Sequence, residues 1–268
     1  MSKIAFCFLL YDKVKHNKEW ETFFKGDSTK SHTIYSHLKT INEETQDWIK
    51  ENKIKSIKTG WCEESLVYAW IRMIKEGLRN PKNKYFILLS GECIPLYTFN
   101  ETYKKIMNTK KSFINIDDED IKRITGLYWA SQWCILHRKH ARLLVKLIET
   151  EEGKEFMKLL RNRLCSIYNP DPECYCPDNL FPVNWFIYKY DCDGNPYSKK
   201  FLNDFKIGKT TFETWDKSTS SPDILTLSQM KKIKKEICDS GAIFARKFNS
   251  KASGELAMSC GKKIIKNN

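Results

Sequence analysis

The sequence predicts an α/β fold with a parallel central sheet, and three observations support this. Residues 4–11 and 85–89 are continuous apolar runs, which is typical of strands buried on both faces. Between them, residues 63–78 place apolar side chains on one face of a helix. Strands and helices alternate in this way through the first half of the chain, which indicates right-handed βαβ units. We therefore expect ligands to bind at the carboxyl ends of the strands.

The same periodicities place the remaining elements. Helices are expected at 19–25, 100–108, 140–148, 153–164 and 228–238, and further strands at 32–38, 53–58, 112–116, 185–190, 210–215 and 242–248. A loop rich in Pro and Cys is expected at 169–182. Because neither an internal repeat nor a long linker divides the chain, the sequence predicts one domain over residues 1–252 and a polar tail over 253–268.

The formal net charge of +13 indicates an anionic partner such as nucleic acid, a membrane surface or a phosphorylated ligand. The charge is spread along the chain, and its densest block, Lys231–Lys235, has the spacing of a solvated helix face. The sequence has neither a recognised nucleic-acid motif nor a basic block interleaved with aromatic residues. No nucleic-acid partner is expected, although a basic nucleic-acid-binding protein remains an alternative interpretation.

The amino terminus predicts neither a membrane span nor a signal peptide. The apolar run at 4–11 is far shorter than the roughly 20 residues of a transmembrane helix, and no cleavage site follows it. We therefore expect a cytoplasmic protein whose ten cysteines are reduced. The abundance of Lys, Asn and Ile favours an AT-rich genome, such as that of a large virus or a protist.

Two acidic clusters have the residue types that bind Mg²⁺ or Mn²⁺. Asp117–Asp120 follows an expected strand, and Asp191–Asp193 contains an Asp-x-Asp triplet. Carboxylates are hard oxygen ligands, so a metal–diphosphate site could form at either cluster. Such triplets are common in solvated turns, and the turn interpretation is favoured for both.

A lone acid and a pair of cations are stronger candidates. Asp178 lies between prolines beside apolar residues, an environment that raises a carboxyl pKa and suits a general base. A purely structural loop is the competing interpretation. Arg246 and Lys247 interrupt the apolar segment 242–248, where an anionic diphosphate would satisfy them. Alternation at a solvent-exposed sheet edge explains them equally well.

Several segments, in order along the chain, resemble family 14 glycosyltransferases, the core-2/I-branching and peptide xylosyltransferase family, including its plant branch. The start at Lys3–Phe6 resembles the family's first strand. The others are Trp20–Gly26 (the plant W-E-x-F-F-K-G), Glu63–Ala69 (E-S-V-V-Y-A), Tyr85–Leu96 (F-V-L-L-S-E-S-C-I-P-L), Ser131–Lys139 (S-Q-W-F-x-L-H-R-K), Ser221–Asp223 (S-P) and Phe244–Phe248 (F-A-R-K-F). Together they span about residues 3–250, and their shared order makes the resemblance specific.

The resemblance implies a GT-A-type, Rossmann-like α/β sandwich with a mixed, mainly parallel central sheet. It implies an inverting enzyme that moves a sugar, N-acetylglucosamine or xylose by preference, from a UDP-sugar to a hydroxyl of a glycan or protein acceptor. The family needs no metal or other cofactor, because cations on the protein stabilise the departing diphosphate. By resemblance, Arg246 and Lys247 take that role, so their diphosphate interpretation is favoured over the sheet edge.

The resemblance also places the catalytic base. The family's base is a Glu in a loop of the form C-Y-x-D-E-H-Y-L-P. An ungapped match of Cys174, Tyr175 and Pro182 puts Asp178 at this position, whereas a second register puts Asn179 there. We favour Asp178 because its flanking residues then fit. An Asn could not accept a proton, so the second register implies an impaired enzyme or a degenerate, lectin-like protein.

Six further residues are expected near the substrates by resemblance. The nucleotide-sugar set is Tyr11, His37, Glu64 and Ser65, and the set near the transferred sugar and acceptor is Glu92 and Trp133. The sequence departs from the family where an Asp expected soon after His37 is replaced by Lys39, which implies altered recognition of the base. The alternative to the metal-independent mechanism is a metal-dependent transferase that uses Asp117–Asp120.

Overall fold

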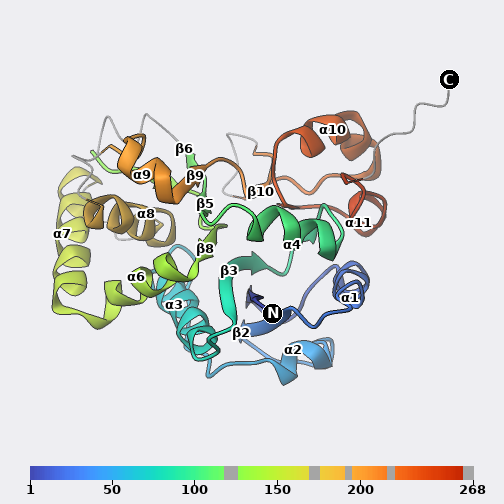
Figure 1. Ribbon diagram of the computed structural model, residues 1–268, viewed down its shortest axis with the longest axis horizontal. Coiled ribbons are helices and arrows are strands. Elements are labelled where there is room, and N and C mark those ends of the chain that lie inside the picture. The colour runs from blue at the N-terminus through green and yellow to red at the C-terminus, as the bar shows by residue number, and fades with distance from the viewer. Residues whose placement is uncertain (118–125, 169–175, 191–194, 216–220, 262–268) are drawn as a thin grey trace.

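The computed structural model describes residues 1–117, 126–168, 176–190, 195–215 and 221–261, and its centre is a six-stranded sheet (Figure 1). The strand order is β2 (His32–Leu38), β1 (Lys3–Leu10), β3 (Asn83–Ser90), β8 (Ile135–His137), β5 (Ser112–Ile114) and β9 (Phe205–Ile207). Strand β8 runs antiparallel to both of its neighbours, and the other pairs are parallel. The predicted α/β fold with a mixed, mainly parallel sheet is therefore confirmed.

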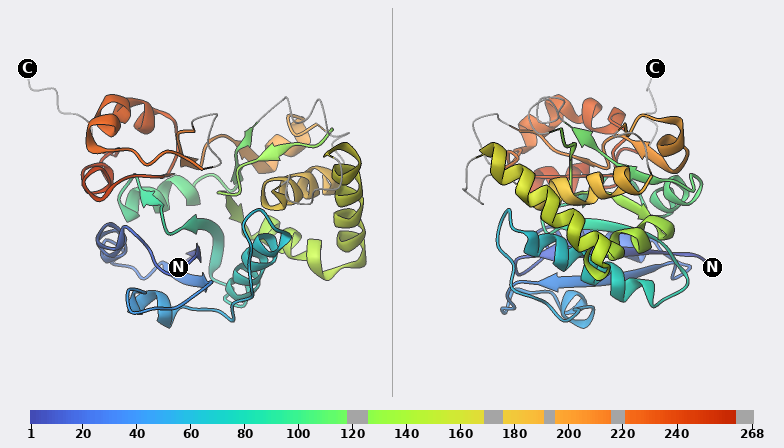
Figure 2. Two further views of the ribbon diagram at one scale, coloured as in Figure 1. Left: turned by 180° about the vertical axis from the view of Figure 1, so that it is seen from behind. Right: turned by 90° about the vertical axis from the view of Figure 1, so that its left-hand side faces the viewer.

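Alternating side chains of β1 point to opposite faces of the sheet, which separates two cores. Ile4, Phe6 and Phe8 face α1 (Asn17–Lys25), α2 (Asp47–Glu51) and α4 (Phe99–Met107). Ala5 and Cys7 face α3 (Glu64–Leu78), α6 (Arg138–Glu149), α7 (Glu151–Tyr168) and α8 (Pro177–Lys189). Figure 2 shows these helices from two further sides. The central strands are thus covered on both faces, as continuous apolar runs predict.

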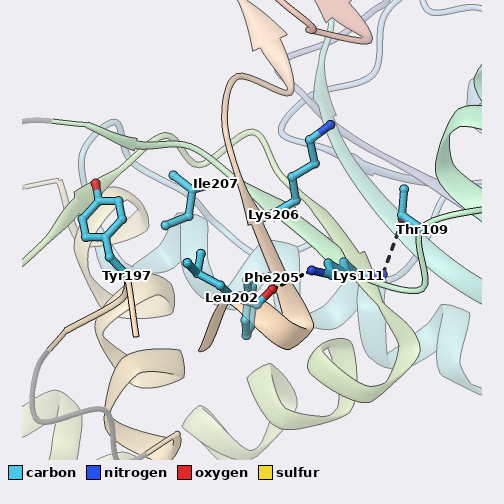
Figure 3. Close-up of a pocket in the computed structure, with 7 residues that line it drawn as sticks. All are labelled: Thr109, Lys111, Tyr197, Leu202, Phe205, Lys206 and Ile207. Carbon is cyan, nitrogen blue, oxygen red and sulfur yellow. Dashed lines mark hydrogen bonds between the residues drawn. The ribbon is translucent and has the colours of Figure 1, made fainter. Parts of the chain in front are cut away.

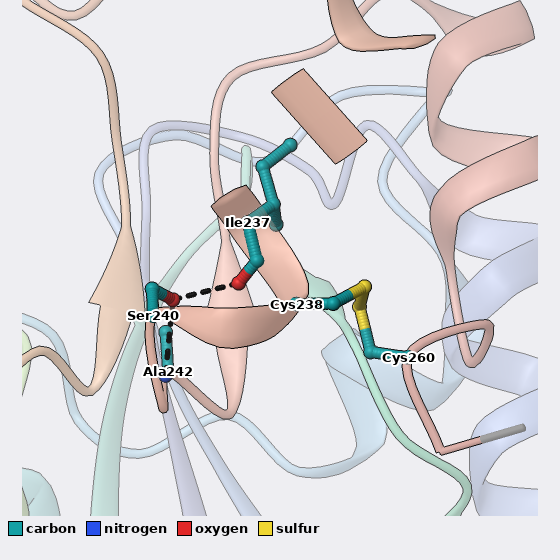
Figure 4. Close-up of a disulfide and its surroundings, with 5 residues drawn as sticks. All are labelled: Ile237, Cys238, Ser240, Ala242 and Cys260. Atoms are coloured by element: carbon teal, nitrogen blue, oxygen red, sulfur yellow. Dashed lines mark hydrogen bonds between the residues drawn. A yellow bond between two sulfur atoms is a disulfide. The ribbon is translucent and has the colours of Figure 1, made fainter. Parts of the chain in front are cut away.

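A third core lies at the end of the molecule where the chain terminates (Figures 1 and 2). Its small sheet has the order β10 (Thr211–Phe212), β11 (Phe244–Ala245) and β4 (Ile94–Pro95). Helices α10 (Leu227–Asp239) and α11 (Ser250–Leu256) pack beside it, and the Cys238–Cys260 disulfide joins α10 to the segment after α11 (Figure 4). Packed structure therefore continues to Cys260, past the boundary expected at residue 252.

Two disulfides correct the expectation that the cysteines are reduced. Cys62 bonds to Cys176, and Cys238 bonds to Cys260. Cys7, Cys93 and Cys134 are buried free thiols. The structure does not describe the side chains of the other three cysteines. Cys62 and Cys176 are 114 positions apart in the sequence. Because such distant residues meet only in the folded chain, the local spacing of the cysteines did not indicate this pairing. Among the described residues, no helix is long and apolar enough to cross a membrane.

The largest error in the predicted elements concerns α8. The sequence predicted a loop to residue 182 and a strand at 185–190, but residues 177–189 form a helix. Pro177 occupies its first turn, where a missing N–H costs nothing. Nearly every residue from 177 to 187 is buried, so the helix lacks the polar stripe that would have revealed its period. The expected strand at 53–58 is also absent, with only a bridge between Lys53 and Ser36, and residues 169–175 of the predicted loop lie outside the described residues.

Smaller elements complete the description. Strand β6 (Ile116–Asp117) pairs with β7 (Trp129–Ala130), and α9 (Lys199–Asp204) precedes β9. The expected strands at 210–215 and 242–248 are confirmed only in part, because β10 and β11 have two residues each. Arg246 and Lys247 follow β11 and are not inside it, so they lie in the loop that leaves the small sheet.

Candidate active site

The carboxyl ends of β1, β2 and β3 meet at one edge of the central sheet, and their loops interlock there. The Asn42 side chain, after β2, donates to Asp12, after β1, over 3.0 Å. The Lys15 backbone N–H donates to the Gly91 carbonyl, after β3, over 2.8 Å. This edge is where parallel sheets bind ligands.

Two of the residues expected at the nucleotide behave differently at this edge. Tyr11 is 66% exposed, and the Lys39 ammonium lies 5.5 Å from the centroid of its ring. His37 is fully buried, its Nε2 accepts a hydrogen bond from the Ile57 N–H over 3.0 Å, and burial lowers its pKa. Tyr11 is thus available to a ligand, whereas His37 is a neutral ring that fixes the segment after α2.

The Arg246 guanidinium is held between an aromatic ring and an acid. It lies 4.8 Å from the centroid of the Trp133 ring, and its Nη1 is 3.4 Å from the Glu213 carboxylate. The Arg246 side chain is only 12% exposed, so the cation–π and ionic contacts act with little screening by water. Its buried Nε has no hydrogen-bond partner among the described residues.

Lys247 lies beside Arg246 in a cluster of mixed charge. Its ammonium donates to Ser221 Oγ over 2.5 Å. Burial, and then the neighbouring charge of Arg246, lower the pKa of Lys247, while Glu92 and Glu213 oppose this shift. Glu92 also forms an ion pair with Lys15. The pairing of Ile94 with Ala245 between β4 and β11 explains why Glu92 lies near the two cations.

Asp178 lies in the first turn of α8 and is 6% exposed. Burial raises the pKa of its carboxyl to about 6, although the backbone N–H groups of Asp178 and Asn179 oppose the shift. Its Oδ1 is buried without a hydrogen-bond partner among the described residues. An acid in this state can exchange a proton near neutral pH, as a general base must.

A narrow cavity lies beside Asp178. It has a volume of about 10 Å³ and is lined by residues that include Ser131, Gln132 and Val183. This is room for roughly one water molecule. The carboxyl with the unpartnered Oδ1 therefore adjoins a space the size of a single hydroxyl group.

Three contacts fix the start of α8. The Cys62–Cys176 disulfide ties the residue before the helix to the segment that precedes α3. The Asn179 side-chain oxygen accepts from the Gln132 N–H over 3.2 Å, so the amide of the rival base candidate is already engaged. Asn184 bonds the backbone of Tyr128, accepting over 3.0 Å and donating over 2.8 Å.

Segment 128–133 consequently connects the two parts of the candidate site. Its Tyr128 and Gln132 backbone groups hold α8, which carries Asp178, through Asn184 and Asn179. Directly after Gln132, the Trp133 ring packs against Arg246. Of the sequence-predicted residues, the structure brings Arg246, Lys247, Glu92 and Trp133 together, and Asp178 lies on α8, which is hydrogen-bonded to the segment that carries Trp133.

Glu64 and Ser65 serve other contacts. Glu64 forms an ion pair with Arg161 of α7 and accepts from the Tyr68 hydroxyl over 3.0 Å. Ser65 donates to Glu63 over 2.9 Å and accepts from the Gly60 N–H over 3.0 Å. Both residues brace the start of α3, and no contact of theirs in the described residues reaches Arg246 or Lys247.

Sequence reasoning missed Glu213 and the Cys62–Cys176 disulfide. Glu213 is separated from Arg246 by 33 positions and meets it only because β10 and β11 pair in parallel. Its one local signal is an acid that directly follows the apolar residue Phe212, at the end of an expected strand. The disulfide had no signal in cysteine spacing.

The described residues contain no group of three or more His, Cys, Asp or Glu side chains placed to hold a metal ion. Asp117 ends β6, and the rest of the Asp117–Asp120 cluster lies outside the described residues. So does the Asp191–Asp193 triplet. Both metal-site predictions therefore stay untested.

Comparison with known proteins finds a family match in the first half of the chain. Residues 4–130 match the family model described as Core-2/I-Branching enzyme. The chain is also similar to Glycosyltransferase BC10 of Oryza sativa subsp. japonica, with 28% identity over 179 residues, 60% of this chain and 44% of that protein. The chain thus spans less than half the length of this relative. The family match ends before Trp133, so it does not include Asp178, Arg246 or Lys247.

Two solved structures match the chain at low similarity. One is a glycosyltransferase involved in the glycosylation of the major capsid of PBCV-1, with a TM-score of 0.41, 10% identity, and coverage of 91% of this chain and 94% of that one. The other is the galactosyltransferase LgtC in complex with donor and acceptor sugar analogs, with a TM-score of 0.46, 9% identity, and coverage of 96% and 97%.

Proposed function

We propose that the chain is a glycosyltransferase of the Core-2/I-branching family, whose model matches its residues 4–130, and that it catalyses a specific reaction. The protein transfers a sugar from a UDP-sugar to a hydroxyl group of a glycan or protein acceptor, with inversion at the anomeric carbon. N-acetylglucosamine and xylose are the favoured sugars. No metal takes part.

The observation that carries this proposal is the state of Asp178. A carboxyl with a pKa of about 6 and an unpartnered oxygen adjoins a cavity that admits one hydroxyl group. In the proposed reaction the acceptor hydroxyl enters this cavity while the rest of the acceptor stays outside. Asp178 takes its proton as the oxygen attacks, which places a base near its optimal pKa at the reacting atom.

The leaving group is the role proposed for Arg246 and Lys247. As the new bond to the anomeric carbon forms, the bond from that carbon to the diphosphate oxygen breaks, and its electron pair leaves with UDP. Two cations already fixed by Trp133, Glu213 and Ser221 stabilise this charge without reorganising. An α-linked donor gives a β-linked product because the attack is in line.

A donor panel tests the proposal. The full chain is incubated with UDP-N-acetylglucosamine, UDP-xylose, UDP-galactose and UDP-glucose without an acceptor, with and without EDTA, and UDP release is measured. We expect slow hydrolysis of one donor that EDTA leaves unchanged. A loss in EDTA that Mn²⁺ restores would instead establish a metal-dependent transferase. If no donor turns over and UDP fails to raise the melting temperature, the glycosyltransferase proposal is wrong.

A further inference from the structure

A second hollow lies away from the candidate active site (Figure 3). It is an open depression on the surface, with a volume of about 500 Å³. Thr109 and Lys111, which precede β5, line one side of it, and Leu202 of α9 and the edge strand β9 line another. The exposed ring of Tyr197 stands at its rim.

The sheet topology separates this hollow from the donor edge. Strands β5 and β9 run parallel to each other, and β5 runs in the direction of β3 because both are antiparallel to β8. The segments before β5 and β9 therefore lie at the end of the sheet opposite the carboxyl ends of β1, β2 and β3. Strand β9 is also the edge opposite β2.

The charge of the hollow is positive. Lys111 and Lys206 line it, and no acidic side chain does so among the described residues. The nearest acid in sequence, Asp204, is already bound to Lys139 and to the Tyr190 hydroxyl, each over 2.6 Å. Lys206 is exposed, its ammonium lies 5.5 Å from the Phe113 ring centroid, and it forms no ion pair with any described residue.

The remaining lining suits a sugar ring. Tyr197 is 55% exposed, and its ring stands beside the apolar side chains of Leu202 and Ile207 (Figure 3). The C–H face of a hexose packs on such a surface, while its hydroxyl groups can bond to the Lys111 ammonium, one of whose three donors is used by the Leu202 carbonyl over 2.7 Å.

We infer that this hollow is a second glycan site, which binds an anionic saccharide that carries carboxylate or sulfate groups. Tyr197 packs against the ring on the face of Ile207, and Lys206, which projects from the other face of the edge strand β9, pairs with an acidic group of the saccharide where it passes over this edge. The choice of a saccharide among anionic ligands rests on the proposed function. A site remote from the reaction would hold a long acidic acceptor while its end is glycosylated, and the excess of positive charge on the chain would draw such a polymer to the protein.

Equilibrium binding tests this inference without using catalysis, so its failure and a failure of sugar transfer can be told apart. The probe is tetragalacturonic acid, compared with maltotetraose, a neutral saccharide of equal length, by isothermal titration calorimetry on the full chain. We expect saturable binding of the acidic probe, and binding of the neutral one weaker by about tenfold or more, because charge-assisted hydrogen bonds are lost.

Matched variants locate the site. Lys206→Glu and Tyr197→Ala should each weaken binding of tetragalacturonic acid by about tenfold, a change of about 1.4 kcal/mol. Lys232→Glu makes the same charge change on the exposed face of α10 and should alter the affinity by less than about twofold, as expected for a screened distant charge. Thermal melts verify that each variant is folded.

Three results would overturn the inference. The first is equal binding of the acidic and neutral probes. The second is an equal loss in Lys206→Glu and Lys232→Glu, which would mean diffuse attraction to the whole surface. The third is an absence of saturable binding by the folded wild-type protein.

Discussion

The two charged parts of the candidate site differ in how many partners they have. Asp178 is almost completely buried, and one of its oxygens has no partner among the described residues. Arg246 and Lys247 are less buried, and each contacts other side chains, including Trp133, Glu213 and Ser221. The first arrangement moves a pKa toward neutrality, and the second fixes cations in place.

This difference fits two separate chemical tasks. A group that accepts and releases a proton needs a pKa near the working pH, which isolation of a carboxyl provides. A group that stabilises a leaving diphosphate must stay charged and stay in position. Glu92 and Glu213 oppose the drop in the pKa of Lys247 and so help to keep that ammonium protonated. Mutations that give one region the properties of the other are therefore the most informative.

The largest expected effect is on Asp178, the isolated group. Replacement by Asn keeps the shape of the side chain but removes its ability to accept a proton. We expect the rate of sugar transfer in Asp178→Asn to fall by about 10²–10⁴-fold, as is typical on losing a general base. Initial rates with the donor identified by the panel give the measurement.

The adjacent residue is the matched control. In Asp178→Asn/Asn179→Asp the carboxyl moves by one position on α8, to a side chain whose oxygen contacts the Gln132 N–H. We expect no recovery of the transfer rate. Full activity of Asp178→Asn, or recovery in the double variant, would assign the base to another residue and favour the second sequence register.

The second largest effect is on the partnered cations. Arg246→Ala and Lys247→Ala each remove a preformed contact to the departing diphosphate, and we expect kcat to fall by about 10²–10³-fold in each. Lys232→Ala, which removes an exposed lysine of α10, should leave kcat unchanged. A fall in kcat with unchanged UDP affinity in Lys247→Ala would show that Lys247 acts in the transition state alone.

The third effect is on the pH dependence of stability, and it comes from the isolation of Asp178. The pKa of this carboxyl rises from 3.8 to about 6 on folding, which corresponds to about 3 kcal/mol. Between these values the unfolded chain has lost this proton and the folded chain retains it. The unfolded state therefore binds fewer protons, and the free energy of unfolding decreases as pH rises.

Asp178→Asn should lack this penalty. Urea unfolding at pH 4.5 and pH 7.5 measures the free energy of unfolding of both proteins. The value for the variant should exceed that for the wild type by more at pH 7.5 than at pH 4.5. An advantage that does not depend on pH would mean that the wild-type carboxyl is not held protonated by burial. Arg246 and Lys247 stay charged in the wild type across this range. The stability difference between the wild type and Arg246→Ala or Lys247→Ala should therefore not change with pH.

The sequence predicted the central strands well because their periodicity is local. The apolar runs of β1 and β3 and the amphipathic pattern of α3 each need only a window of about ten residues. Helix α8 escaped this reasoning since it is buried on all sides and contains Pro182. Its burial is set by α3, α6 and α7, which a local window does not contain.

For the candidate site, motif resemblance supplied identities, and the structure supplied contacts. Arg246 and Trp133 were chosen from separate segments. Nothing in the sequence indicated that the Trp133 ring packs on the Arg246 guanidinium. Glu64 shows the converse, because its position in a family motif suggested the nucleotide, whereas its carboxylate binds Arg161. A side chain's partner depends on chain pairing over many residues, which composition and spacing do not encode.

The smallest expected effects come from removing the two disulfides, which differ in loop length and in their distance along the chain from Asp178. Cys62–Cys176 adjoins Asp178 and closes 114 residues, whereas Cys238–Cys260 closes 22 residues beside α10 and α11 (Figure 4). Chain entropy alone predicts that losing the longer closure costs about 1.5 kcal/mol more stability. Urea unfolding of Cys62→Ala/Cys176→Ala and Cys238→Ala/Cys260→Ala measures this difference. Only the first pair should also lower the transfer rate, by about tenfold, because freeing the start of α8 misplaces its carboxyl. An unchanged rate in the first pair would show that α8 is held by Asn179 and Asn184 without help from the disulfide.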